Sequence, residues 1–150
     1  MYGIIDENYE WICESEYSGI YKVWNGSTDN LVKVNEEYLL IAVYDFQEGH
    51  GAEIINEYGG TIVPMEYYDI NAQCGMNRLI VENSEGYYGA IDLNGNLEIA
   101  CQYDELGDFS YDEETYAMKD GAVFAVDIYG NERFLTNADD CWQIDSNLYE

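Results

Sequence analysis

The sequence predicts an all-β protein in which tandem antiparallel β-hairpin or meander units of about 35 residues form a single barrel-like or stacked domain. Three observations lead to this prediction. Similar segments recur at nearly constant spacing, apolar and polar residues alternate with the period of two typical of strands, and Gly-containing turns separate these segments. No longer stretch has the 3.6-residue apolar period of a helix. We therefore expect one domain over residues 1–150.

The internal copies are defined by residues that recur at a fixed offset. Gly95 follows Gly59 by 36 residues, and Tyr103 follows Tyr67 by the same distance. The copies lie near residues 2–20, 54–70, 88–106 and 124–135, and an insertion near residues 24–37 separates the first two. Such a spacing is typical of a fold that repeats one supersecondary unit.

Each copy has the pattern of a hairpin. A short strand of the form Gly-x-Ile-Asp leads into a turn of Asn-Gly type, and a second strand ends at a Tyr-Asp corner. Asn94-Gly95 and Tyr129-Gly130 place Gly where a positive φ is needed, and Asp92 is placed to bond the turn backbone. Between the copies, alternating segments at residues 78–82 and 116–119 predict a third strand.

The pattern resembles the WG-repeat family, whose unit runs Trp-Gly-hydrophobic-Ile-Asp, a turn Gly, Ile-Pro and then Tyr-Asp. The matching pairs are Tyr2-Gly3, Tyr88-Gly89, Ile5-Asp6, Ile91-Asp92, Val126-Asp127, Val63-Pro64 and Tyr103-Asp104. The resemblance covers about two thirds of the chain. The chain departs from the family in having Tyr in place of the motif Trp, a single Pro, and Tyr9 in place of one turn Gly. The resemblance implies an antiparallel β-repeat scaffold with binding roles and supplies no conserved chemistry.

The charge of the chain is extreme. Asp and Glu number 31 against 5 Lys and Arg, so the formal net charge is −26. A net charge of magnitude about 2–8 is sufficient to keep a small domain soluble. Nucleic acids and anionic membranes are excluded as direct partners because both require Lys and Arg to neutralise phosphate. The acidity is then explained by one of four alternatives: a basic protein surface as partner, a cation-rich medium, a multivalent metal or a halophilic origin.

The remaining sequence features argue against a membrane segment and a metal site. The N-terminal residues have no secretory pattern, and no apolar stretch reaches the 18 residues of a membrane helix. We therefore expect a cytoplasmic protein. With one His and no CxxC pair, zinc is not expected. Cys13, Cys74, Cys101 and Cys141 are interpreted as buried thiols, with a disulfide pair as the alternative.

No pattern in the sequence is typical of an active site. His50 is the only imidazole, and the glycines on both sides of it predict a flexible loop. Carboxylates are too abundant for any pair to be singled out. Residues 92–96 look like a calcium loop, but the Gly comes too early and the terminal Glu is not at its position. The sequence therefore predicts a non-enzymatic protein without a cofactor or metal.

Acidic residues interleaved with aromatic ones form the candidate partner-binding surface. Its residues are Asp104, Glu105, Asp108, Phe109, Tyr111, Asp112, Glu113, Glu114, Asp139, Asp140, Trp142 and Asp145. Alternate strand residues lie about 6.6–7 Å apart, close to the phosphate spacing along a nucleic-acid strand. This favours an inhibitor that masks a basic nucleic-acid-binding surface, similar in size and charge to phage inhibitors such as anti-CRISPR proteins. The alternative is a WG-repeat interaction module that binds a peptide or cell-envelope component through its Tyr-rich face.

Overall fold

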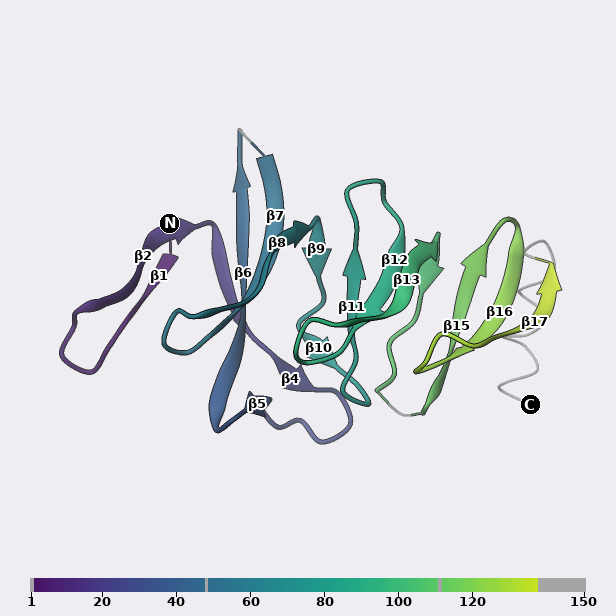
Figure 1. Ribbon diagram of the computed structural model, residues 1–150, viewed down its shortest axis with the longest axis horizontal. Coiled ribbons are helices and arrows are strands. Elements are labelled where there is room, and N and C mark those ends of the chain that lie inside the picture. Colours follow the sequence, from purple (N-terminus) through teal and green to yellow (C-terminus); the bar gives the residue numbers. More distant parts are fainter. Residues whose placement is uncertain (1, 48, 111, 138–150) are drawn as a thin grey trace.

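The computed structural model describes residues 2–47, 49–110 and 112–137. All regular elements in these ranges are strands, so the all-β prediction is confirmed. The strands form five sheets arranged in an elongated row, from the N-terminal hairpin to the strands that precede residue 138 (Figure 1). None of the described sheets closes on itself, so the barrel-like arrangement is not found in this part of the chain.

The first two sheets hold the N-terminal part of the chain. β1 (Tyr2–Ile5) and β2 (Trp11–Tyr17) form a hairpin by themselves. The next sheet has the spatial order β3-β6-β7-β8, with β5 paired to β6. Its strands are β3 (Gly19–Lys22), β5 (Lys33–Val34), β6 (Glu37–Phe46), β7 (Gly49–Asn56) and β8 (Thr61–Tyr67).

Two four-stranded antiparallel sheets follow along the row. The order of the first is β13-β12-β11-β9, and that of the second is β14-β15-β16-β17. Their strands are β9 (Asp69–Ile70), β11 (Leu79–Glu82), β12 (Tyr88–Ile91), β13 (Leu97–Tyr103), β14 (Glu105–Leu106), β15 (Glu114–Lys119), β16 (Ala122–Asp127) and β17 (Glu132–Asn137). A small parallel pair, β4 (Trp24–Asn25) and β10 (Gln73–Cys74), links the segment after β3 to the segment after β9.

The sheets pack face to face, and an apolar core lies between successive sheets. Along β6, Leu39 and Ile41 enter one core, whereas Leu40 and Ala42 enter the core on the opposite face. In β11, Leu79 and Val81 share the first of these cores, and Ile80 points into a third core. Because successive side chains of a strand point to opposite faces, β6 and β11 are buried on both sides.

The same turn closes four hairpins and the β11–β12 connection. In each turn the side-chain oxygen of an Asp or Asn accepts the backbone N–H groups two and four residues later. The residue three positions after the Asp or Asn has a positive φ. The first residues of these turns are Asp6, Asn56, Asn83, Asp92 and Asp127. A local side-chain to backbone bond of this kind favours a turn over continued strand.

The chain passes from one sheet to the next at three similar corners. After β2, β8 and β13 end in a tyrosine, one residue interrupts the strand before β3, β9 and β14 begin. That residue donates its N–H to a carbonyl of the neighbouring sheet: Ser18 to Val43, Tyr68 to Glu82, and Asp104 to Met118. Each hairpin is thereby hydrogen-bonded to the sheet that follows it.

Candidate binding surface and groove

The acidic surface expected from the sequence lies around β14 and β15. Asp104 and Glu105 are exposed at the third corner, and residues 112–114 are exposed where β15 begins. Asp108 is half-buried, and its Oδ1 accepts the N–H of Ser110 at 3.1 Å. The carboxylates of this region are therefore mostly directed to solvent.

The structure divides this acidic run into two parts. Glu105 pairs with Met118 across β14 and β15, whereas Glu114 stands four residues earlier on β15. At a rise of about 3.3 Å per residue, the two acidic groups lie at opposite ends of the strand pair. The Glu114 carboxylate also forms an ion pair with Arg133, whose Nη2 lies 2.8 Å from Glu114 Oε1.

One aromatic member of the expected surface belongs to the interior. Phe109 is only 1% exposed and packs in the core that contains Tyr103, Ala117 and Val126, so its ring cannot contact a partner. Burial of this apolar ring in the core is favourable in free energy, although the neighbours of Phe109 in the sequence are acidic and exposed. The other expected residues Tyr111, Asp139, Asp140, Trp142 and Asp145 lie outside the described residues.

Two of the five Lys and Arg side chains, Lys119 and Arg78, are used inside the protein. Lys119 Nζ donates to both carboxylate oxygens of Glu132 at 3.0 Å and lies 5.2 and 5.3 Å from the ring centroids of Tyr103 and Phe124. Arg78 is buried, and its Nε donates to the carbonyl of Ile128 at 2.8 Å. These cations neutralise few of the carboxylates, so the excess negative charge remains on the outside.

Cation–π contacts hold three of the basic side chains, those of Lys119, Arg78 and Lys33. An aromatic ring lies beneath each cation: Tyr103 and Phe124 for Lys119, Tyr129 for Arg78, and Tyr38 for Lys33. For Lys119 and Arg78 a glutamate is also present, Glu132 and Glu98 respectively. Attraction to the ring and to the carboxylate adds, because both act on the same positive charge.

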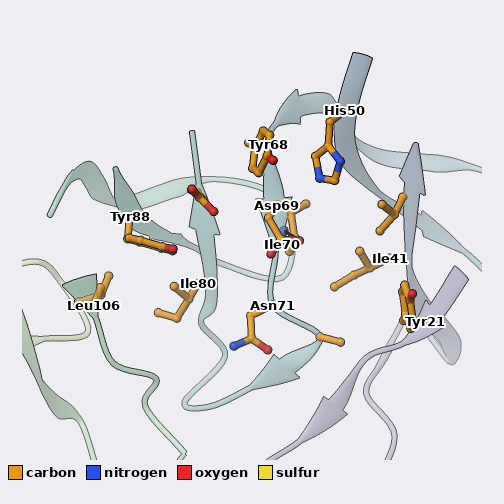
Figure 2. A pocket seen from close by; sticks show the side chains of 13 residues that line it. Tyr21, Ile41, His50, Tyr68, Asp69, Ile70, Asn71, Ile80, Tyr88 and Leu106 are labelled. Carbon is orange, nitrogen blue, oxygen red and sulfur yellow. Dashed lines mark hydrogen bonds between the residues drawn. The ribbon is translucent and has the colours of Figure 1, made fainter. Parts of the chain in front are cut away.

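A groove of about 720 Å³ lies between the β3-β6-β7-β8 sheet and the β13-β12-β11-β9 sheet and extends to Leu106 of the β14-β15-β16-β17 sheet (Figure 2). Typical ligand clefts measure about 300–1,000 Å³. Figure 2 shows Tyr68 and His50 at one end, Tyr88 and Leu106 on one side, and Tyr21 on the other. Its apolar lining comes from Ile41, Val43, Ile70, Ala72, Ile80 and Leu106. Asp69 and Glu82 of the β13-β12-β11-β9 sheet contribute carboxylates to the lining.

His50 is not in a loop, as the sequence suggested, but near the start of β7. Its ring stacks on Tyr68 with the centroids 4.2 Å apart and the planes 31° from parallel. Its Nδ1 lies 3.2 Å from Oδ1 of Asp45, opposite it on β6. These contacts place two stacked aromatic rings at the end of the groove.

The groove has a negative electrostatic environment. The charge of Glu82 raises the pKa of the Tyr88 hydroxyl, as do burial, a hydrogen bond to Glu82, and the charges of Asp69 and Glu105. Asp69 is held in place because its Oδ1 accepts the N–H of Ile70 at 2.9 Å. Within the described ranges, no Lys or Arg forms an ion pair with Asp69 or Glu82. Glu105 belongs to the expected acidic surface and its charge acts on Tyr88, so this surface adjoins the groove.

The described residues hold no group of three or more His, Cys, Asp and Glu arranged to bind a metal ion. Cys74 and Cys101 are free thiols, and burial raises the pKa of each. A thiol whose pKa is raised holds less of the reactive thiolate, so these two cysteines lack the environment of a nucleophile.

The groove was missed in the sequence because its residues come from seven separate stretches of the chain. No strand was predicted for residues 38–53, yet they contain most of β6 and the first part of β7. A signal was present: the run Leu39-Leu40-Ile41-Ala42-Val43 is uninterrupted apolar, which is typical of a strand buried on both faces. Pairing that run with the segment around Ile54 would have placed His50 near a strand end.

Comparison with known proteins gives no relative: no family model, curated protein or solved structure matches the chain significantly. Among the described residues there is also no helix long and apolar enough to cross a membrane.

Proposed function

We propose that the protein is a non-enzymatic binding protein that masks a basic, nucleic-acid-binding surface of another protein. The observation that carries this proposal is the display of the charge. The sheets form an elongated row (Figure 1). Most Asp and Glu residues in the described ranges are exposed to solvent, while Lys119, Arg78 and Arg133 are paired with glutamates of the same chain.

Electrostatics explains how such a surface acts. A basic groove meant for phosphates attracts a rigid array of carboxylates, and this attraction steers the encounter and raises the association rate. The carboxylates lie on strands and corners, where hydrogen bonds fix the backbone, so binding orders few additional residues. The target is a nuclease, polymerase or similar enzyme, as in inhibition of a defence nuclease by a phage protein.

We also propose that the four hairpins are copies of one repeating unit, related to the WG-repeat scaffold. The shared turns that start at Asp6, Asn56, Asp92 and Asp127, and the corners after β2, β8 and β13, support this relation. In this view the repeat fixes the spacing of the acidic groups along the row. The scaffold itself is not committed to one partner.

A salt-gradient experiment tests the masking function. The full chain is immobilised, proteins are loaded at low salt, and elution with NaCl is compared with elution by duplex DNA. Each eluted protein is then purified and its affinity for the chain measured between about 0.1 and 0.5 M salt. We expect a nucleic-acid-binding protein whose binding collapses over this range and which DNA displaces. Salt-insensitive partners, or partners that DNA does not displace, would contradict the proposal.

The Tyr-lined groove favours a second candidate, a module that binds a peptide or cell-envelope component through its tyrosines. Tyr21 and Tyr68 are 56% and 45% exposed at its rim, and large exposed aromatic rings are typical of recognition surfaces. The same gradient separates the candidates, because binding that depends on aromatic contacts persists in high salt.

A further inference from the structure

We infer that the groove between the β3-β6-β7-β8 sheet and the β13-β12-β11-β9 sheet binds an arginine side chain of a protein partner. This inference rests on the proposed function, since the partner is taken to carry a basic surface. It adds a specific site to a charge effect that is otherwise spread over the whole chain.

The first argument is charge complementarity. Asp69 and Glu82 line the groove, Glu105 lies close enough to act on Tyr88, and the cations described above are paired elsewhere. A guanidinium that enters the groove meets carboxylates that still have a free acceptor: Asp69 uses Oδ1 for the Ile70 amide and retains Oδ2. A forked pair of N–H groups matches a carboxylate better than a single ammonium does.

The second argument is the shape and chemistry of the walls. The stacked rings of His50 and Tyr68 offer a flat face at the end of the groove, on which a planar guanidinium can stack. Ile70, Ile80 and Leu106 provide an apolar lining along which the methylene stem of an arginine can lie. A carboxylate, an aromatic face and an apolar lining therefore meet in one place.

The third argument comes from the protein itself. Arg78 is held by the Tyr129 ring 5.9 Å from its Cζ and by Glu98 at 3.9 Å, and Lys119 is held by aromatic rings and Glu132. The groove repeats this combination of tyrosine and carboxylate, and no Lys or Arg is among its lining residues. We expect a cation from outside to complete it.

Titration of the full-length ¹⁵N-labelled chain with the peptide Gly-Ser-Gly-Arg-Gly-Ser-Gly tests the inference by NMR. We expect saturable shifts of the amide signals of Tyr68, Ile80 and Glu82. The peptide with lysine should bind more weakly, and the one with citrulline, an uncharged analogue of the same shape, should not bind. Shifts spread over all acidic segments, or equal binding of citrulline, would overturn the inference.

Variants identify the residues responsible. Asp69→Asn with Glu82→Gln removes two charges but retains acceptors for the Ile70 amide and the Tyr88 hydroxyl. We expect it to weaken the arginine peptide by about tenfold or more. The matched control, Glu7→Gln with Glu10→Gln, removes two charges from the distant N-terminal hairpin and should change affinity by less than about twofold at 0.15 M salt.

The stacked ring is tested in the same way. Tyr68→Leu should weaken the arginine peptide more than the lysine peptide, because both cations are attracted to the ring but only the planar guanidinium also stacks on it. Tyr58→Leu, at an exposed turn, is its control and should leave both affinities unchanged. If a variant fails to fold, the position of the shifts in the wild-type spectrum still decides the matter.

The outcomes distinguish the inference from the proposed function. If a DNA-displaced partner is found but Asp69→Asn/Glu82→Gln binds it no worse than the Glu7→Gln/Glu10→Gln control, the groove inference fails and the masking function stands. If the peptide binds in the groove but no DNA-displaced partner exists, the masking function fails and the groove serves another basic protein.

Discussion

Tyr9 and Gly95 occupy the same left-handed backbone position in their hairpin turns, with φ of 66° and 90°. Each lies three residues after an aspartate whose Oδ1 accepts two turn amides, Asp6 and Asp92 respectively. A residue with a side chain is strained at positive φ by about 1–2 kcal/mol, whereas glycine is not. The N-terminal hairpin therefore contains backbone strain that the Asp92 turn avoids.

Tyr9→Gly should stabilise the N-terminal hairpin by roughly 0.5–1 kcal/mol, since relief of strain exceeds the entropy that glycine adds to the unfolded chain. The Tyr9 ring is 84% exposed, so little packing is lost. Amide hydrogen exchange of β1 and β2 measures the change. Asn8→Gly is the control, because Asn8 has no positive φ and the substitution should only destabilise. Equal effects of the two variants would contradict the strain argument.

The aspartate turns make part of the stability depend on pH. Burial opposes ionisation of Asp92 and Asp127, but hydrogen bonds from the side chains and amides of Asn96 and Asn131 outweigh it and hold both pKa values below the ordinary value. The folded state therefore binds fewer protons than the unfolded state, and this contribution is present above the unfolded pKa of about 4 and is lost as the pH falls through the folded pKa.

Asp92→Asn/Asp127→Asn should keep the turns and lose this pH dependence, because Asn56 and Asn83 already form the same turn without a titrating group. Urea unfolding between pH 7 and pH 3 measures it. Relative to wild type, the variant should lose less stability below about pH 4. Relief of repulsion among the acids acts on both proteins and cancels in the difference. Parallel curves for the two proteins would refute this account.

The hairpins were predictable from the sequence because local chemistry determines them. Asp92 and Gly95 define a turn through one side-chain acceptor and one positive φ, both visible in the residue types. The packing of whole sheets was not predictable in the same way. Phe109 was placed on the surface because its sequence neighbours are acidic, yet contacts with β15 and β16 bury it. The groove likewise depends on segments brought together only by the packing of three successive sheets.

Tyr103→Phe should cost about 1 kcal/mol, the usual net worth of one hydrogen bond. The Tyr103 hydroxyl donates to Glu132 Oε2 at 2.7 Å. That bond, with the Lys119 bond and charge, holds the pKa of Glu132 below its ordinary value against burial. The variant should therefore also raise the pKa of Glu132, which ¹³C carboxyl NMR measures. Tyr116→Phe, on the exposed side of β15, should change neither quantity; an unchanged Glu132 pKa in Tyr103→Phe would contradict the network.

Gly89 allows two strands to approach more closely than any side chain would permit. A Cβ at this position would lie 2.4 Å from the carbonyl oxygen of Ile99, where the pairing of β12 with β13 shifts register. Backbone atoms on β13 cannot move aside without breaking the ladder, so Gly89→Ala should destabilise the protein by about 2 kcal/mol or more.

Gly49→Ala provides the control for this prediction. Gly49 also lies in a strand, but a Cβ there meets no atom within 4 Å and its φ is not positive. This substitution should be neutral or slightly stabilising, since alanine lowers the entropy of the unfolded chain. Chemical unfolding of both variants measures the difference. Because the clash involves strand backbone rather than a mobile side chain, a small loss for Gly89→Ala would mean that β13 shifts its register to accept the methyl group.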